Sequence, residues 1–156
     1  MEKKVDKQNT LCLYLLYVHI TLFIAFFTIT LFQQFILFPS LSLMDELSYK
    51  NYFSYALNRI DYLSYAIMTV EIMTAVLMLC IRTKLLKKWA LSFNLFVLAL
   101  SIVFFVFVIK PQQVLLSHGF AEESMTRLAQ LNYGFITIML FRAFLLIYLI
   151  FKSQQK

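Results

Sequence analysis

Four long runs of apolar residues dominate the chain, and short stretches with charged or turn-forming residues separate them. The runs cover about 11–38, 62–81, 89–109 and 131–151. A helix of about 20 mostly apolar residues crosses the ~30 Å hydrocarbon core of a bilayer. The pattern therefore predicts an all-α, polytopic membrane protein with four transmembrane helices in an antiparallel bundle.

Two prolines mark where two of these helices are expected to end. Pro39 follows the first run and Pro111 follows the third. Proline has no backbone N–H to donate and its ring clashes with the preceding turn of a helix. We therefore expect the first and third helices to stop at these residues.

The connections 39–61 and 111–130 are too patterned to be plain loops. Aromatic residues recur every three or four positions in the first connection, which predicts an interfacial helix that runs into the second span. A binding cleft lined with tyrosine is the alternative. In the second connection, Glu122 and Glu123 suit the first turn of a helix that continues into the fourth span. No internal repeat interrupts the chain, so a single membrane domain over 1–156 is expected.

Within each run, most polar residues fall on one stripe. The stripe steps alternate between three and four residues, which is the spacing of the inner seam of a left-handed helix bundle. The sequence thus predicts a polar interior inside a coat of Leu, Ile, Val and Phe. The four stripes are His19, Phe23, Phe26, Thr30 and Gln33; Asp61, Ser64, Met68, Glu71 and Ala75; Asn94, Leu98, Ser101 and Phe105; and Asn132, Phe135, Met139, Arg142 and Leu146.

Composition supports this prediction and excludes several other classes of protein. Hydrophobic residues make up 62% of the chain and charged residues 14%, against about 45–50% and 25% in soluble domains. So apolar a chain is neither disordered nor an ordinary soluble domain. Two cysteines are too few for a disulfide scaffold.

The distribution of charge predicts the orientation. Nine of the 14 basic residues lie in the two terminal segments and in the connection between the second and third runs, and four lie on the opposite side. By the positive-inside rule, both termini are expected to lie in the cytoplasm. The first run is too long for a signal peptide and is expected to be an uncleaved anchor. The net charge of +6 is explained as a topology signal, so no nucleic acid partner is expected.

Four polar residues within the runs are the first candidates for chemistry. His19, Glu71 and Arg142 lie near mid-membrane and Asn94 somewhat nearer the cytoplasm. Ionisable groups at this depth face the protein interior and pair with one another. We expect a buried Glu71–Arg142 ion pair, which either fixes helix register or belongs to a proton-relay, substrate or cofactor site. A second set of polar residues is expected at the outer face: Gln33, Gln34, Gln113, His118, Arg127 and Asn132.

No complete catalytic constellation, phosphate loop or zinc motif is visible, and two histidines at different depths predict no metal site. The preferred function is a non-enzymatic accessory or assembly protein of the membrane, without a cofactor. One alternative is a haem- or quinone-linked oxidoreductase that uses His19. Another is a small proton-coupled transporter that uses Glu71. The expected partner is the lipid bilayer, and a membrane-protein partner and a homo-oligomer both stay open.

Short motifs along the chain carry a resemblance to known proteins: His19, the stretch 32–39, Glu71, Pro111, Leu116, Gly119, Phe120, Arg127, Leu128, Asn132 and Arg142. On these residues the chain resembles a family of uncharacterised bacterial four-helix inner-membrane proteins, which implies a location in a bacterial inner (plasma) membrane. The resemblance implies fold and location, and it implies no activity. The chain departs from the family pattern at Gln113, Ala121 and Tyr133, where His, Asp and Trp are usual. A second resemblance, carried by His19 and the helix count, is to J-type membrane protoporphyrinogen oxidases and copper-resistance D-type proteins.

Overall fold

The computed structural model describes residues 2–41, 43–44, 46–81, 86–118 and 122–154. Nearly all of these residues are helical. The helices are α1 (Glu2–Phe32), the π-helix η1 (Gln33–Leu37), α2 (Phe38–Leu41), α3 (Glu46–Cys80), α4 (Lys88–His118) and α5 (Glu122–Gln154). Because α1, η1 and α2 follow one another without a break, the chain forms four long rods.

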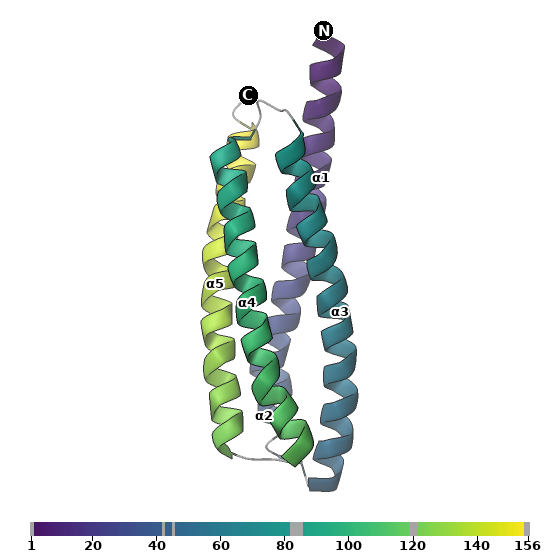
Figure 1. Ribbon diagram of the computed structural model, residues 1–156, viewed down its shortest axis with the longest axis vertical. Helices are drawn as coiled ribbons and strands as arrows, with labels where there is room; N and C mark the ends of the chain where they lie inside the picture. The colour runs from purple at the N-terminus through teal and green to yellow at the C-terminus, as the bar shows by residue number, and fades with distance from the viewer. Residues whose placement is uncertain (1, 42, 45, 82–85, 119–121, 155–156) are drawn as a thin grey trace.

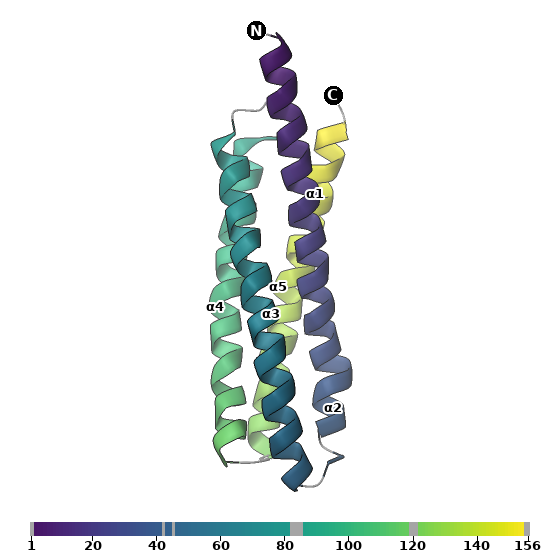
Figure 2. The ribbon, with the colours of Figure 1, turned by 90° about the vertical axis from the view of Figure 1, so that its right-hand side faces the viewer.

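The four rods lie side by side along the length of the molecule (Figures 1 and 2). Helix α1 packs on α3, α3 on α4, and α4 on α5, and α1 also contacts α5, so the rods enclose a common core. The chain begins and ends at the same end of the bundle, where α3 also leads to α4; we call this the terminal end (Figure 1). The opposite end, where α2 leads to α3 and α4 to α5, is called the loop end.

All four rods are long and apolar enough to cross a membrane. The qualifying segments are Lys7–Leu41, Asn51–Cys80, Lys88–Ile109 and Glu122–Ser153. The rods are longer than the runs that predicted them. The 35 residues of α3 extend about 52 Å at 1.5 Å per residue. Much of the connection 39–61 therefore belongs to α3, and much of 111–130 belongs to α4 and α5.

The predicted helix end at Pro39 is wrong, because the first rod continues through it to Leu41. A π-turn immediately precedes the proline, and the Phe38 N–H donates to the Gln33 carbonyl, five residues earlier. This wider turn inserts one extra residue into the helix. It relieves the clash between the proline ring and the preceding turn, so the helix need not stop.

The predicted helix end at Pro111 is also wrong, because Pro111 lies inside α4. Its side chain is buried and lines a depression between α4 and α5 with Arg127 and Leu131. Helices of membrane proteins tolerate an internal proline where neighbouring helices pack around it. The third rod therefore extends to His118. As predicted, α5 begins with Glu122 and Glu123 in its first turn.

The predicted stripes form the core of the bundle. Every stripe residue is buried except Asp61, which is half-buried. The core has two apolar parts. The larger one extends through the middle and the terminal end. The smaller one lies at the loop end and comprises Leu37, Phe38, Leu41, Phe53, Leu57, Val108, Leu115 and Leu128.

Candidate functional site: a buried polar cluster across four helices

One polar cluster joins all four rods near the middle of the bundle. Helix α1 contributes His19, α3 contributes Glu71 and Thr74, α4 contributes Asn94 and α5 contributes Arg142, and all five side chains are buried. Four of them were predicted to gather there, because each lies on the inward stripe of its helix. We call these five residues the central cluster.

The Glu71–Arg142 ion pair expected from the sequence is present. Arg142 Nη2 lies 2.7 Å from Glu71 Oε1, and neither side chain has any exposed surface. The same Nη2 donates to His19 Nε2 at 3.0 Å. The guanidinium also lies over the Phe23 ring, 5.2 Å from its centroid, where a cation is attracted to the aromatic face. Arginine suits this position, because its several donors bind two partners at once.

The contacts of His19 define which ring nitrogen carries the proton. The Thr74 hydroxyl donates to the Glu71 carbonyl at 2.8 Å, so its oxygen accepts the 2.9 Å hydrogen bond from His19 Nδ1. Nε2 then accepts from Asn94 Nδ2 and from Arg142, each at 3.0 Å. His19 is therefore a neutral imidazole with its proton on Nδ1, and both ring nitrogens are engaged within the protein.

Thr74 is the member of the cluster that the sequence reasoning missed. It lies next to the stripe residue Ala75 rather than on the stripe. The available signal was its position three residues after Glu71, because residues three apart share a helix face.

Asn94 of α4 connects α1 and α5 through the two ends of its side-chain amide. Its Nδ2 donates to His19, and its Oδ1 accepts a longer, 3.4 Å hydrogen bond from Arg142 Nε. Two cluster atoms stay without a partner among the described residues, namely Glu71 Oε2 and Arg142 Nη1. One is an acceptor and the other a donor, so the cluster retains unused capacity to bind a small polar group.

An aromatic layer separates the central cluster from the loop end. Phe26 of α1 packs edge-on against Phe135 of α5 at 5.8 Å and against Phe105 of α4 at 5.9 Å. Tyr65 of α3 adds an edge contact to Phe105 at 5.5 Å. Each rod thus supplies one ring, and edge-to-face packing is the arrangement that aromatic rings prefer.

Beyond the aromatic layer, some of the predicted outer polar residues form a second buried group. Asn132 Nδ2 donates to Gln34 Oε1 at 2.9 Å, which joins α5 to η1. Gln33 and Gln34 are both buried although they are adjacent. The extra residue of the π-turn explains this, because it shifts the inward stripe from Gln33 to Gln34.

The remaining predicted outer residues do not join that group. Arg127 is exposed on α5 and lines surface depressions with its neighbours Glu123 and Thr126. The side chains of Gln113 and His118 lie outside the part of the chain whose side chains the structure describes.

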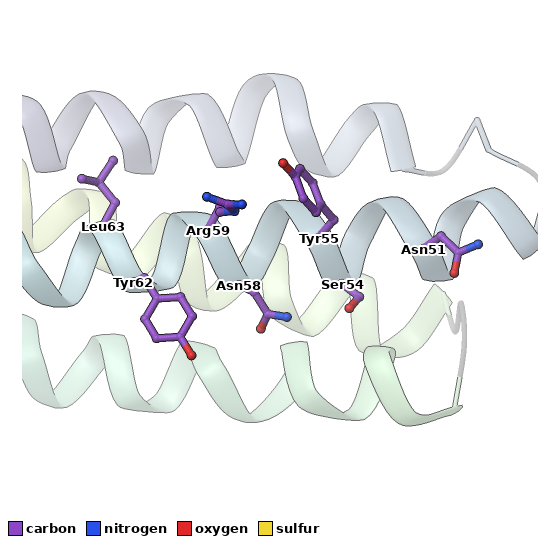
Figure 3. Close-up of a pocket in the computed structure, with 7 residues that line it drawn as sticks. All are labelled: Asn51, Ser54, Tyr55, Asn58, Arg59, Tyr62 and Leu63. Atoms are coloured by element: carbon purple, nitrogen blue, oxygen red, sulfur yellow. The ribbon is translucent and has the colours of Figure 1, made fainter.

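The tyrosines of the predicted alternative, a tyrosine-lined cleft, lie on an open face of one helix. Tyr55 and Tyr62 lie on α3 with Arg59, whose guanidinium is 5.4 Å from the centre of the Tyr55 ring. Figure 3 shows that all seven lining side chains project from this one helix. Because the described side chains of the other rods contribute no wall, this face is a surface and the central cluster is the better candidate site.

No group of three or more His, Cys, Asp or Glu side chains suited to a metal ion occurs within the described residues. Cys12 is buried and Cys80 is exposed, and both are free thiols. No family model matches the chain. Neither a curated protein nor a solved structure matches it.

Proposed function

We propose that this chain is a multi-pass protein of a bacterial inner membrane that acts as a non-enzymatic accessory or assembly protein. In this proposal the four rods cross the bilayer as an antiparallel bundle, with both termini in the cytoplasm. The central cluster supplies the main support. Its side chains are buried and make hydrogen bonds to one another across four helices. Such an arrangement fixes the register of the helices relative to one another, which is a known role of buried polar groups.

The outward projection of the bundle supports a role in binding a partner. With the central cluster at mid-bilayer, about ten residues on either side cover the ~30 Å hydrocarbon core. The loop end then projects beyond it, with its own apolar core around Phe53 and Leu128. Its surface carries exposed Asn58, Arg59 and Arg127, in contrast to the apolar surface nearer the middle.

Photo-crosslinking in living cells tests the accessory role. A benzophenone amino acid at Tyr55, exposed on the projecting part, is expected to give a discrete protein adduct. The matched site is Phe144, which is 70% exposed against 65% for Tyr55 but lies near Arg142 of the central cluster. It is expected to give no discrete protein adduct, because it faces lipid. A discrete adduct at neither site would contradict the accessory role. Reporter fusions after Met44 and after Gln154 test the orientation separately.

The transporter alternative has one specific observation in its favour. Glu71 Oε2 and Arg142 Nη1 have no partner among the described residues, so the ion pair has capacity to engage a transported ion or a proton. Proton flux into proteoliposomes is measured for the wild type and for Glu71→Gln, and the comparison decides between the two functions. The accessory role predicts the same background flux for both. Flux that the substitution abolishes would establish transport.

The oxidoreductase alternative gains less from the geometry. An iron ligand needs a free imidazole nitrogen, and His19 uses Nδ1 for Thr74 and Nε2 for Asn94 and Arg142. A haem would therefore require this network to be broken. A visible spectrum of the protein purified in mild detergent, with extraction for quinone, tests this function directly. A Soret band lost in His19→Ala would overturn the accessory role.

A further inference from the structure

The buried polar side chains are distributed asymmetrically along the bundle. Relative to the central cluster, every other buried polar side chain that the structure describes lies toward the loop end. On the terminal side the buried side chains are apolar, and examples are Cys12, Leu16, Met78, Leu91 and Leu149. The polar residues on the loop side are Thr30, Gln33, Gln34, Ser64, Ser101, Gln112 and Asn132.

The unpartnered polar atoms show the same asymmetry. Besides Glu71 Oε2 and Arg142 Nη1, the buried side-chain atoms without a partner in the described part of the chain are Gln33 Nε2, Asp61 Oδ1, Ser64 Oγ and Gln112 Oε1. All four lie on the loop side of the cluster. Leaving a buried polar atom unpaired costs about 1–3 kcal/mol. Native proteins avoid this cost by pairing such atoms with ordered water.

Three of the unpartnered atoms belong to side chains on the same face of α3. Asp61, Ser64 and Glu71 lie on the same inward stripe, separated by about 4.5 Å and 10.5 Å along the helix. Met68 fills the stripe between Ser64 and Glu71. Its unbranched, flexible side chain is the kind that yields to a small molecule.

The aromatic layer is thinnest beside α3. The other three rods place a buried phenylalanine in it, namely Phe26, Phe105 and Phe135. At this level α3 directs the small hydroxyl of Ser64 inward, while Tyr65 lies half outside with 49% of its surface exposed. The inner part of this layer therefore consists of rings from α1, α4 and α5, whereas α3 contributes the small, unpartnered hydroxyl of Ser64.

We propose that water enters the bundle from the loop end along the α3 stripe and reaches Glu71 and Arg142, whereas the apolar core of the terminal end is dry. Water at Glu71 Oε2 and Arg142 Nη1 supplies the hydrogen bonds that these atoms do not find in the protein. The charged pair is then in contact with the solvent on one side of the membrane only. This path does not depend on whether the protein is an accessory protein or a transporter.

Cysteine modification in membrane vesicles tests the path. The background is Cys80→Ala, in which buried Cys12 serves as an internal control at the terminal side. The test variant is Ser64→Cys and the matched control is Ala75→Cys. Both positions lie on the same stripe of α3, on opposite sides of Glu71, and both are buried. An SDS titration of each variant confirms that it folds before it is compared.

A small, membrane-impermeant methanethiosulfonate cation is added to vesicles of either orientation. The variants Glu122→Cys and Trp89→Cys, at exposed positions of the loop end and the terminal end, report which side holds the loop end, so the result does not depend on the proposed orientation. We expect Ser64→Cys to react at least tenfold faster than Ala75→Cys, and only from the loop-end side. Equal rates for the two variants, or reaction of Ser64→Cys only from the terminal side, would overturn the path.

A measurement on the unmodified protein provides a second test. In nanodiscs, water-edited NMR measures magnetisation transfer from water to protein sites. We expect rapid transfer to the Arg142 guanidinium and slow transfer to the Met78 methyl group, which is buried on the terminal side. Equal build-up at the two sites would show that water does not reach the cluster.

Discussion

The two halves of the bundle core belong to the same four rods but are held together in different ways. From the central cluster to the loop end, hydrogen bonds and an ion pair connect the helices. From the cluster to the terminal end, the core consists of apolar side chains such as Leu16, Met78 and Leu149. Lipid tails are as apolar as leucine, so apolar contacts alone give membrane helices little preference for one register. The hydrogen bonds and the ion pair of the polar half therefore specify how the four rods are arranged. The apolar side chains of the other half pack within that arrangement.

The largest effect is expected from Arg142→Met. The substitution leaves the Glu71 carboxylate buried without its cation and removes the hydrogen bonds to His19 and Asn94. Breaking a buried pair in this way costs about 3–5 kcal/mol. The free energy of unfolding from SDS titration in mixed micelles measures it. The control is Arg127→Met on the exposed surface of α5, which is expected to change stability by less than about 0.5 kcal/mol.

Met78→Ala tests the apolar half by the same titration. Met78 is fully buried on the terminal side, whereas Met73, on the same helix, is 58% exposed and provides the control. Truncating a buried methionine costs about 2–5 kcal/mol in soluble proteins. We expect about 2 kcal/mol, the low end, because the unfolded helix stays in lipid and loses mainly packing contacts. A loss as large as that of Arg142→Met would contradict the division between the two halves.

Thr74→Val makes a smaller change within the polar half. It keeps the shape of the side chain but removes the oxygen that accepts from His19 Nδ1. The buried donor is then unpaired, so we expect a loss of about 1 kcal/mol. Thr69 provides the control, because its hydroxyl bonds only within its own helix and is exposed. If Thr69→Val and Thr74→Val have equal effects, the hydrogen bond to His19 contributes nothing.

The smallest effect is expected at the first turn of α5. Glu122 and Glu123 are exposed there, and their charges favour the helix N-terminus. Replacing both with Gln is expected to cost about 0.5 kcal/mol at low salt and less at high salt, because salt screens exposed charges. A loss of several kcal/mol would show that the loop end depends on these charges more than on its apolar core.

The sequence predicted the core well because its signal is periodic. A step of three and four residues is a property of each helix alone, so burial of the stripe residues followed without knowledge of the neighbouring helices. Contacts between members of the central cluster could also be predicted from the sequence. Equal depth on inward stripes was sufficient to predict the contact between Glu71 and Arg142.

The features that the sequence did not predict depend on neighbouring helices. Thr74 lies one residue off its stripe and three residues after Glu71, and its partner His19 belongs to α1. Pro39 ends most helices, but here a π-turn absorbs the extra residue and brings Gln34 to Asn132 of α5. In both cases the partner of the side chain lies on another rod, and the periodicity of a single helix does not identify that partner.

A double-mutant cycle at Glu71 and Arg142 tests the central claim most directly, namely that a buried ion pair fixes the packing of the four rods. The free energy of unfolding is measured for Glu71→Gln, for Arg142→Met and for the double variant. We predict that the double variant is more stable than Arg142→Met alone, because no unpaired charge is left in the core. Losses that add to within about 0.5 kcal/mol would mean that the two residues do not interact, and would contradict the account.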